Sequence, residues 1–348
     1  SGAGIMTQPV RWAILGAGKF AREHMGPAIH AASGSQLVAL GSSSQDKAAP
    51  FKAFAPGLRV HDTYDAVLAD GEVDAVYIPL PNHLHVPWTI KALEAGKHVL
   101  CEKPIALKAS DFDALIAARD VSGLVAADAF MIPHHSQLQR AKELVADGAL
   151  GELVHIDGTL SYHNAGDVTN IRHDPAKGGG ALPDIGVYPT VCARFVTGLE
   201  PTTATARVEY DPVFKTDWYA SATLEFPGIE MRFYVSTQMA NRQTMVFHGD
   251  KGFIEITAPF NSNLYEGDEV RVHNASHSDT RVYRFTGINQ YRFEIEAFAR
   301  AVRGKKQQQQ QSNLNLNLNR NLNRRLEKGK NQQQQQQPEQ TEKRPASS

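Results

Sequence analysis

The sequence predicts an α/β domain followed by an α+β domain with a large, mainly antiparallel open sheet. Short apolar runs alternate with amphipathic stretches over the first 125 residues, whereas strand-like segments follow one another from about residue 150. A glycine-rich turn follows the first apolar run, as it does in doubly wound sheets. We therefore place the two domains at residues 6–128 and 129–304, followed by a low-complexity tail at 305–348.

The first domain alternates strands and helices. The expected strands are residues 10–16, 36–42, 73–81 and 97–101, and the expected helices are residues 19–32, 45–55, 63–70 and 85–96. Strands separated by helices of this length form a parallel sheet that is covered on both faces. Such a sheet binds ligands beyond the carboxyl ends of its strands, so we expect the site there.

The second domain is rich in strands. The expected strands are residues 153–163, 202–210, 219–226, 231–237, 243–249, 252–258 and 270–275, and residues 290–304 are expected to form a helix. Several of these strands alternate apolar and polar residues, which indicates a sheet with one open face. Because a bare apolar face is a liability, we expect a second copy of the chain to cover it, in a homodimer or homotetramer.

The tail combines glutamine runs with an asparagine–leucine stretch, a composition typical of disorder. Four leucines (Leu314, Leu318, Leu322 and Leu326) nevertheless recur every four residues and would form one apolar stripe on a helix. We expect a tail that is partly helical around residues 312–328 and disordered beyond.

Composition excludes several classes of protein. The chain has 348 residues, 42% of them apolar, and a formal net charge of -1, so neither nucleic acid nor a membrane is an expected partner. The first residues, SGAGIM, lack the basic and apolar regions of a secretory signal. Two cysteines, Cys101 and Cys192, imply no disulfide framework. We expect a cytoplasmic globular protein.

Residues 15–21, LGAGKFA, form a G-x-G-x-x-A pattern with Gly16, Gly18 and Ala21 at its key positions. The first glycine permits a tight turn, the second lets a pyrophosphate approach the backbone, and the small third residue lets the helix pack closely on the strand. A simple strand–helix turn is the alternative, but the pattern follows a strand and opens a helix, as a nucleotide site requires. We predict a dinucleotide-binding Rossmann domain, with Lys19 and Phe20 also at the cofactor.

The end of the second strand indicates which cofactor is bound. NAD-binding chains place an acidic residue there for the ribose hydroxyls. This chain has Ser42 and Ser43, with Lys47 one helical turn later, and these groups suit a 2′-phosphate. NADP is therefore the preferred cofactor, and NAD is the alternative because Asp46 could reach a ribose. Ser44 could simultaneously cap the following helix.

Residues 101–104, CEKP, end a strand that should be wholly apolar with Glu102, Lys103 and Pro104. Charges in this place are either a solvated strand end or part of a site. With PNHLH (81–85), EAGKHVLCEKP (94–104) and GGGALPDIGVYP (178–189), the chain resembles the Gfo/Idh/MocA oxidoreductase family from about residue 9 to residue 304. The resemblance implies an enzyme that transfers a hydride between NADP or NAD and a sugar, polyol or related diol.

The resemblance also implies roles for particular residues. Lys103 and Tyr188 would be catalytic, and Tyr188 stands where many relatives have histidine, so the chain resembles the tyrosine branch of the family. The other implied substrate contacts are Asp184, Arg172, His83 and His85, and the other implied cofactor contacts are Pro79, Asn82, His85, Glu102 and Lys103. Alternatives remain for two of these, since Asp184 could cap a helix and Arg172 could be a surface residue.

The chemistry of a lysine and a tyrosine suits this reaction. Oxidising an alcohol requires a group that takes the hydroxyl proton while the hydride leaves the carbon. A phenol with a pKa near 10 is a poor base at neutral pH, but a nearby ammonium favours the phenolate and lowers this pKa. Lys103 is therefore predicted to bind the substrate oxygen and Tyr188 to move the proton, while Glu102 and Pro104 fix the backbone.

Other functions are weighed against this one. Fourteen histidines occur, but the pairs at 83–85 and 134–135 lack cysteine or acid at metal-ligand spacing, so no metal is expected. One rival is a glycosidase of the same family that works through transient oxidation by a retained nicotinamide. A second rival is a sensor that binds cofactor or sugar without turnover, which would not need the lysine and the tyrosine.

Overall fold

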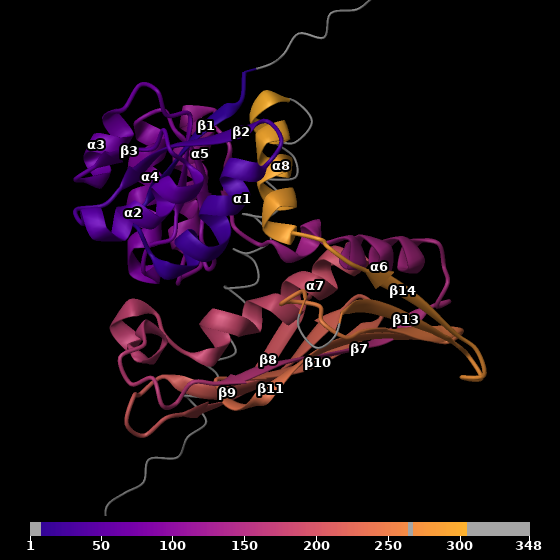
Figure 1. Cartoon of the computed structure of the whole chain (residues 1–348). Helices are drawn as coiled ribbons and strands as arrows, with labels where there is room; N and C mark the ends of the chain where they lie inside the picture. Colours follow the sequence, from indigo (N-terminus) through magenta and orange to yellow (C-terminus); the bar gives the residue numbers. More distant parts are fainter. Residues whose placement is uncertain (1–7, 264–266, 305–348) are drawn as a thin grey trace, which may run out of the picture.

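The computed structural model describes residues 8–263 and 267–304, and the tail predicted at 305–348 lies outside these ranges (Figure 1). A six-stranded parallel sheet forms the first half, in the order β3-β2-β1-β4-β5-β6. Its strands are β1 (Val10–Leu15), β2 (Ser35–Gly41), β3 (Arg59–His61), β4 (Ala75–Ile78), β5 (His98–Cys101) and β6 (Ala126–Asp128). This is the strand order of doubly wound dinucleotide-binding sheets, whose order reverses between β1 and β4.

Helices cover both faces of this sheet. They are the π-helix η1 (Ala21–Met25), α1 (Gly26–Ala31), α2 (Gln45–Phe54), α3 (Tyr64–Ala69), the 3-10 helix η2 (Asn82–Leu84), α4 (His85–Glu94) and α5 (Asp111–Ser122). Two apolar cores result, one on each face, and the four central strands between them are mostly buried, whereas the edge strand β3 is not. The core that contains Trp12 also includes residues of α8 (Gln290–Arg303), which comes from the end of the described chain.

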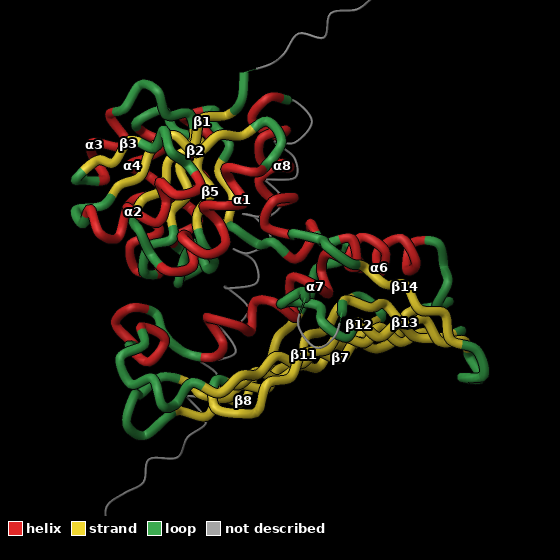
Figure 2. Tube along the Cα trace, in the orientation of Figure 1, coloured by secondary structure: helices red, strands yellow, loops and turns green. Residues whose placement is uncertain are grey.

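An eight-stranded sheet forms the second half, in the order β14-β13-β12-β11-β7-β10-β9-β8 (Figure 2). Its strands are β7 (Leu153–His163), β8 (Thr203–Tyr210), β9 (Asp217–Phe226), β10 (Ile229–Ser236), β11 (Gln238–Gly249), β12 (Gly252–Ile256), β13 (Asp268–Asn274) and β14 (Thr280–Phe285). All neighbours are antiparallel except β7 and β10, which are parallel. The predicted fold class, with its mainly antiparallel open sheet, is confirmed.

One face of the second sheet is covered by helices that lie between it and the first domain (Figure 1). They are η3 (Ile132–His134), α6 (Ser136–Ala146), η4 (Ile171–His173), η5 (Pro175–Lys177), the π-helix η6 (Leu182–Gly186) and α7 (Val187–Thr197). The inward-facing residues of β7, β9, β10 and β12 join these helices in one apolar core. This layer places the helix that carries Tyr188 opposite the carboxyl ends of the parallel strands.

Helix α8 (Gln290–Arg303) ends the described chain and returns to the first domain (Figure 1). Ile295 and Phe298 are buried in the core on one face of the parallel sheet, where the rings of Phe298 and Trp12 lie 5.0 Å apart. At the end of α8, Arg303 donates a hydrogen bond to the carbonyl of Gly34. The last described helix therefore packs against the nucleotide-binding domain, beside β1 and the loop before β2.

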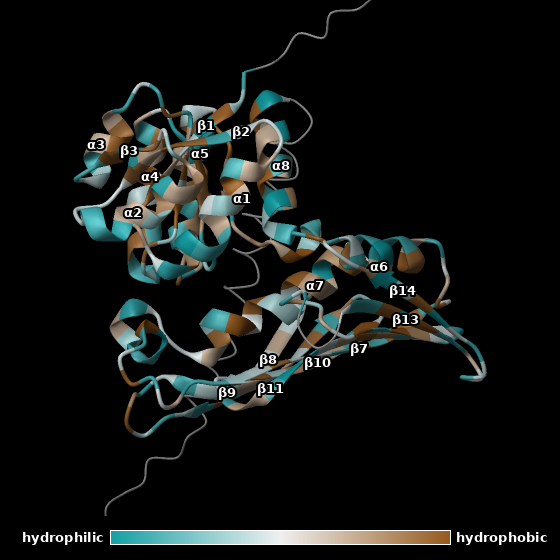
Figure 3. Cartoon of the chain, viewed as in Figure 1, coloured by the Kyte–Doolittle hydropathy of each residue, from teal (hydrophilic) through white to brown (hydrophobic). Residues whose placement is uncertain are grey.

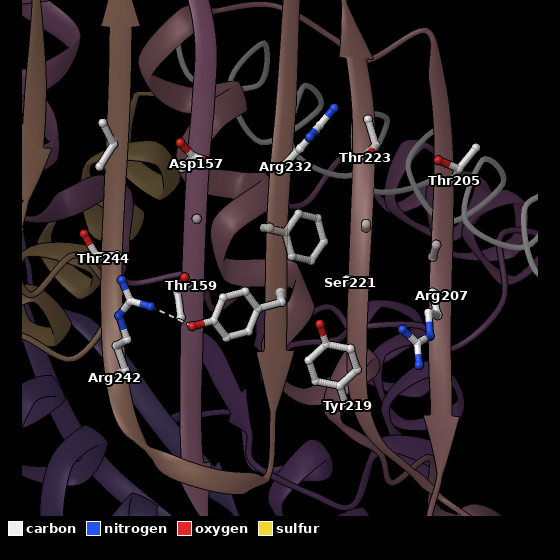
Figure 4. A pocket seen from close by; sticks show the side chains of 16 residues that line it. Asp157, Thr159, Thr205, Arg207, Tyr219, Ser221, Thr223, Arg232, Arg242 and Thr244 are labelled. Carbon is white, nitrogen blue, oxygen red and sulfur yellow. Dashed lines mark hydrogen bonds between the residues drawn. The ribbon is translucent and has the colours of Figure 1, made fainter.

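Polar and apolar residues mix along the strands of the second sheet (Figure 3), and the outward positions are mostly polar, which corrects the expectation of a bare apolar face. Threonine, serine, arginine and tyrosine side chains make up most of the surface around the middle of this open face, with Val246 among them (Figure 4). Arg242 donates a hydrogen bond to the Tyr234 hydroxyl at 2.7 Å, and the rings of Tyr234 and Tyr219 lie 6.2 Å apart. The alternation of the strands is as predicted, but the outward positions carry hydrogen-bonding groups.

Candidate active site

The glycine-rich turn has the shape that a dinucleotide requires. Gly16 adopts a φ of +106°, which glycine tolerates better than other residues, and its N–H donates to the carbonyl of Gly41 at 2.9 Å. A Cβ added at Gly18 would meet nothing within 4 Å, so the backbone there faces open space. Ala21 is fully buried at the helix start, as close packing on the strand demands. These residues fit a bound pyrophosphate.

Lys19 and Phe20 follow directly and are exposed. Phe20 is 39% exposed, although its ring lies 5.1 Å from that of His24 and 5.5 Å from that of Tyr291. Phe20 therefore gives a ligand at the glycine-rich turn an apolar surface to pack against.

The loop after β2 presents hydroxyls and a cation at the carboxyl end of the sheet. Ser43 and Lys47 are exposed, whereas Ser42 is 8% exposed and its hydroxyl donates to the Ser44 carbonyl at 3.1 Å. The Ser44 side chain accepts a hydrogen bond from the Lys47 N–H at 3.3 Å, so the predicted N-cap of α2 is confirmed. The exposed serine and lysine suit a 2′-phosphate.

Lys103 follows β5, and its ammonium reaches helix η6 of the second half. Its Nζ lies 2.6 Å from the carbonyl oxygen of Asp184 and 3.2 Å from Asp184 Oδ1. The same Nζ lies 4.7 Å from the centroid of the Tyr188 ring. Two groups that stand 85 positions apart in the sequence therefore meet between the two sheets.

Asp184 is the centre of this cluster. Its Oδ2 accepts hydrogen bonds from the Tyr162 hydroxyl at 2.7 Å and from Arg172 Nε at 2.9 Å. Burial alone would raise the pKa of Asp184, but the charges of Lys103 and Arg172 and the bond from Tyr162 hold it well below its usual range. Asp184 is therefore an anion that fixes two cations.

The alternative in which Asp184 caps a helix is wrong. Asp184 lies inside η6, whose N-cap is Ala181, and α7 follows with Gly186 as N-cap; neither cap makes a side-chain hydrogen bond. The charge of Arg172 is held by Asp184, which raises the pKa of this guanidinium although burial opposes the shift. Arg172 is thus part of the cluster, with its side chain 45% exposed.

Tyr188 is held by aromatic packing. Its ring lies 6.2 Å from Phe130 in an edge-to-face arrangement and 5.9 Å from Phe260. Burial, followed by the charges of Glu102 and Asp184, raises the pKa of Tyr188 well above its usual value. The expectation of a lowered phenol pKa is therefore wrong, because burial and the two carboxylates outweigh the opposing charge of Arg172.

Glu102 holds the backbone beside Lys103, as predicted. Its Oε1 accepts a hydrogen bond from the Tyr77 hydroxyl at 2.7 Å, and its Oε2 accepts from the Lys103 N–H at 3.2 Å. Tyr77 is fully buried in β4. Burial raises the pKa of Glu102, while Tyr77 and Lys103 oppose the shift. The Glu102 carboxylate is thus held by Tyr77 of the sheet, and it fixes the backbone from which the Lys103 side chain extends.

The prediction that His85 contacts substrate and cofactor is contradicted. His85 is fully buried, and its two ring nitrogens lie 2.7 Å from the Pro104 carbonyl and 2.6 Å from the Leu80 carbonyl. Burial lowers the pKa of His85, against the two backbone carbonyls that raise it, and because each ring nitrogen faces one of these carbonyls neither is left for a ligand. His85 fixes the segment that leads into the site.

The other three residues predicted between β4 and α4 differ in their surroundings. His83 is exposed on η2. Asn82 donates from Nδ2 to the Gly178 carbonyl at 3.2 Å, so it ties the first domain to the loop that leads into η6. Pro79, directly after β4, is half-buried at the same edge of the sheet.

Three residues near the site were missed from the sequence: Tyr77, Tyr162 and Tyr291. Tyr162 occupies an inward position of β7, so alternation predicts its face, but no local signal indicates that Asp184 is its partner. Within the described ranges, no group of three or more His, Cys, Asp or Glu residues could hold a metal ion. None of the helices described there has the length and apolar content that crossing a bilayer requires.

Comparison with known proteins assigns the chain to a family. Residues 10–129 match the oxidoreductase family with an NAD-binding Rossmann fold called GFO_IDH_MocA, and residues 138–255 match the GFO/IDH/MocA C-terminal domain. The chain belongs to the Gfo/Idh/MocA family. The predicted family is therefore confirmed, and with it an enzyme that is a nicotinamide-dependent oxidoreductase.

Individual relatives agree with this assignment. The chain is 41% identical over 301 residues to an uncharacterized oxidoreductase of Rhizobium meliloti, covering 84% of this chain and 89% of the relative. It is 33% identical over 293 residues to D-xylose 1-dehydrogenase (NADP(+)) 2 of Haloferax volcanii, covering 83% and 88%. A crystal structure of the 3-ketoreductase KijD10 of Actinomadura kijaniata with NADP and TDP-benzene matches with a TM-score of 0.83 at 27% identity, covering 92% and 98%.

Proposed function

We propose that this enzyme transfers a hydride between NADP and a carbon of a sugar or closely related polyol or diol. The observation that carries the proposal is the meeting of the Lys103 ammonium with the Tyr188 ring at 4.7 Å, at the carboxyl edge of the nucleotide-binding sheet. The D-xylose dehydrogenase and the sugar ketoreductase among its relatives support this class of substrate. NAD remains the alternative cofactor.

The preference for NADP has two supports. Ser43 and Lys47 are exposed beyond β2, where a 2′-phosphate would lie, and the carboxylate typical of NAD sites is absent from the end of that strand. Two relatives carry NADP in their names or crystals. Lys47→Asp is expected to weaken NADPH binding more than NADH binding, and a fluorescence titration with each cofactor tests this.

The residues divide the work of the reaction. NADP supplies the hydride acceptor or donor when it is bound. Lys103 binds the substrate oxygen, after this oxygen displaces part of its contact with Asp184, and it stabilises negative charge that develops there. Tyr188 moves the proton. Because burial keeps its phenol protonated, Tyr188 is set to donate a proton to a carbonyl that receives the hydride, which is the direction of sugar reduction.

Two variants test these roles. Lys103→Met removes the cation and Tyr188→Phe removes the hydroxyl, and each is expected to lower kcat by about 100- to 10,000-fold. Both should bind NADPH nearly as tightly as the wild type, because the glycine-rich turn and the loop after β2, which would hold the pyrophosphate and the 2′-phosphate, are unchanged in both. Near-normal turnover in both variants would remove the mechanism.

The substrate is to be found with a panel. Aldoses, polyols, diols and keto sugars are assayed in both directions with NADP(H) and with NAD(H), and cofactor oxidation or reduction is followed by absorbance. Turnover with a sugar or keto sugar supports the proposal. Hydrolysis of an aryl glycoside without net change in the cofactor would instead indicate the glycosidase, and cofactor binding without turnover of any compound would indicate the sensor.

We also propose that two copies pair through the open face of the second sheet. This face carries Tyr219, Tyr234 and Arg242, and tyrosine and arginine are enriched at protein interfaces. Sedimentation at micromolar concentration is expected to give a dimer or larger species, and Arg242→Glu with Tyr234→Ala is expected to weaken it. A wild type that is monomeric would contradict the pairing.

A cytoplasmic location is part of the proposal as well. Both cysteines, Cys101 and Cys192, are free and buried, as in proteins of a reducing compartment.

A further inference from the structure

Helix α8 begins at the junction between the two halves of the molecule. Asn289 caps it, since its side chain accepts a hydrogen bond from the Arg292 N–H at 3.1 Å. The next two residues, Gln290 and Tyr291, contact opposite halves. Successive residues on a helix point about 100° apart, so adjacent side chains can reach different neighbours.

Tyr291 contacts the nucleotide-binding half. Its ring lies 5.5 Å from Phe20 in an edge-to-face arrangement and 5.7 Å from His24. Phe20 belongs to the glycine-rich turn, where it is 39% exposed. Tyr291 also packs against the core of each half, the core beside the parallel sheet and the core beneath the antiparallel one. The ring is thus a bridge between a cofactor loop and both cores.

Gln290 contacts the other half. It is 2% exposed, and its Nε2 donates to the Phe260 carbonyl at 3.2 Å. Phe260 is held a second time, because its N–H donates to Gln243 Oε1 at 2.9 Å. The Phe260 ring lies 5.9 Å from that of Tyr188. The first turn of α8 is therefore hydrogen-bonded to Phe260, whose ring packs against Tyr188.

Tyr291 is also near the centre of the site. Burial raises the pKa of Tyr291, and the charges of Tyr188 and Glu102 act in the same direction, while Lys103 opposes them. Electrostatic effects of this kind require proximity. Phe20 contacts Tyr291, Gln290 is its neighbour in the chain, Gln290 is bonded to Phe260, and Phe260 packs on Tyr188. These links form one continuous series.

We propose that the first turn of α8 positions Tyr188 according to the state of the nucleotide loop, with Tyr291 and Gln290 as positioning residues. A cofactor that packs against Phe20 fixes this ring, and the packed series fixes Tyr188 at the reacting carbon. This inference rests on the proposed function of Tyr188. A misplacement of the order of 1 Å at such a group is costly, about 100-fold in rate.

The first experiment replaces the bridging ring. Tyr291→Ala is expected to lower kcat about 10- to 100-fold, with a much smaller change in the Kd of NADPH. Tyr291→Phe keeps the ring and is expected to restore kcat to near the wild-type value. Phe293→Ala is the matched control, since Phe293 lies on the same helix beneath Arg292, and it should leave kcat nearly unchanged.

The control also separates positioning from folding. Circular dichroism and thermal unfolding show whether each variant is folded, and Tyr291→Leu replaces Tyr291→Ala if the latter is not. If Tyr291→Leu or Tyr291→Ala is folded and turns over like the wild type, the inference is wrong. It is equally wrong if Phe293→Ala lowers kcat as much as the change at Tyr291 does.

The second experiment is a double-mutant cycle between Phe20→Ala and Gln290→Ala. Phe20 lies in the glycine-rich turn and Gln290 at the start of α8, so independent effects on kcat would multiply. Because both belong to one series of contacts, we expect the double variant to be little slower than the slower single variant. Multiplying effects would overturn the inference while leaving the proposed function intact, whereas near-normal turnover in both Lys103→Met and Tyr188→Phe would remove the proposed mechanism itself.

Discussion

The two sides of the site are held in place by different forces. Lys103 lies in a network of hydrogen bonds and charges, in which Asp184 accepts its ammonium and Glu102 accepts its backbone N–H. Tyr188 lies instead between the rings of Phe130 and Phe260. The lysine side is electrostatic and directional, whereas the tyrosine side depends on packing.

This difference has a consequence for catalysis. Hydrogen bonds fix an atom along a given direction, so the loss of one partner shifts the ammonium and changes the charge around it. Packed rings tolerate replacement by other apolar groups with a smaller loss. Substitutions among the groups that hold Lys103 should therefore act mainly on kcat and its pH dependence, whereas conservative replacement of a ring that packs on Tyr188 should act mainly on stability.

Among the groups that hold Lys103 and Tyr188 in place, the largest effect is expected from Asp184→Asn. This change removes the anion that holds the Lys103 ammonium and Arg172 Nε, so both cations lose their fixed position. We expect kcat to fall about 100-fold. Steady-state kinetics measure it, and Tyr162→Phe, which removes only one donor to the same carboxylate, is the milder control. Equal losses in the two variants would show that the charge of Asp184 is not what matters.

A smaller effect is expected from Tyr77→Phe. The variant keeps the buried ring but removes the hydroxyl that donates to Glu102 at 2.7 Å. Since this bond lowers the pKa of Glu102, its loss should raise that pKa and move the acid limb of the kcat profile to higher pH. We expect kcat to fall about tenfold. Tyr283→Phe, on the second sheet, is the control, and an unchanged pH profile in Tyr77→Phe would contradict the role of Glu102.

On the tyrosine side, Phe130→Leu tests packing. It removes the edge-to-face contact with Tyr188, and we expect a loss of about 1 to 2 kcal/mol in the free energy of unfolding with a few-fold decrease in kcat. Phe112→Leu, a buried change in the first domain, should cost similar stability without affecting kcat. Denaturant titrations measure the free energy of unfolding of both variants, and steady-state kinetics measure their kcat. A hundredfold loss of kcat in Phe130→Leu would show that ring packing around Tyr188 controls catalysis as strongly as the hydrogen bonds around Lys103 do.

The smallest effect concerns Glu294 of α8, a buried carboxyl group. Glu294 is 3% exposed, and burial, followed by the charges of Glu102 and Asp128, raises its pKa well above the usual value. A raised folded-state pKa contributes stability that is present below the ordinary pKa near 4 and is lost as the pH rises toward the folded value. Glu294→Gln should therefore be less sensitive to this rise in pH than the wild type. Parallel pH dependences of Tm in the two proteins would contradict the assignment.

Much of the fold could be predicted because its signals are local. β7 spans residues 153–163, as alternation predicts, whereas the strand expected at residues 73–81 is shorter and ends at Ile78 because prolines follow. The missed elements had weak signals. β3 has only three residues, and β14 (Thr280–Phe285) is a mostly exposed edge strand. Their place in the sheets comes from neighbours far away in the sequence.

The site was predicted in part. Motifs single out Lys103 and Tyr188, and the structure brings these two together. The partners of these residues come from elsewhere in the chain, as Tyr162 and Tyr291 do, and spacing does not indicate which distant side chain a carboxylate will meet. His85 shows the opposite failure, since a histidine between two backbone carbonyls has no sequence pattern that separates it from a ligand.

The most direct test follows the hydride itself through one turnover. NADPH deuterated at C4 of the nicotinamide is mixed with excess enzyme and a keto sugar that the panel identifies, and the product is analysed by mass spectrometry. We predict that deuterium appears on the reduced carbon, and that Lys103→Met and Tyr188→Phe slow this single step without weakening NADPH binding. Label that is lost to water, or transfer at the wild-type rate in both variants, would contradict a lysine and a tyrosine acting together at one nicotinamide.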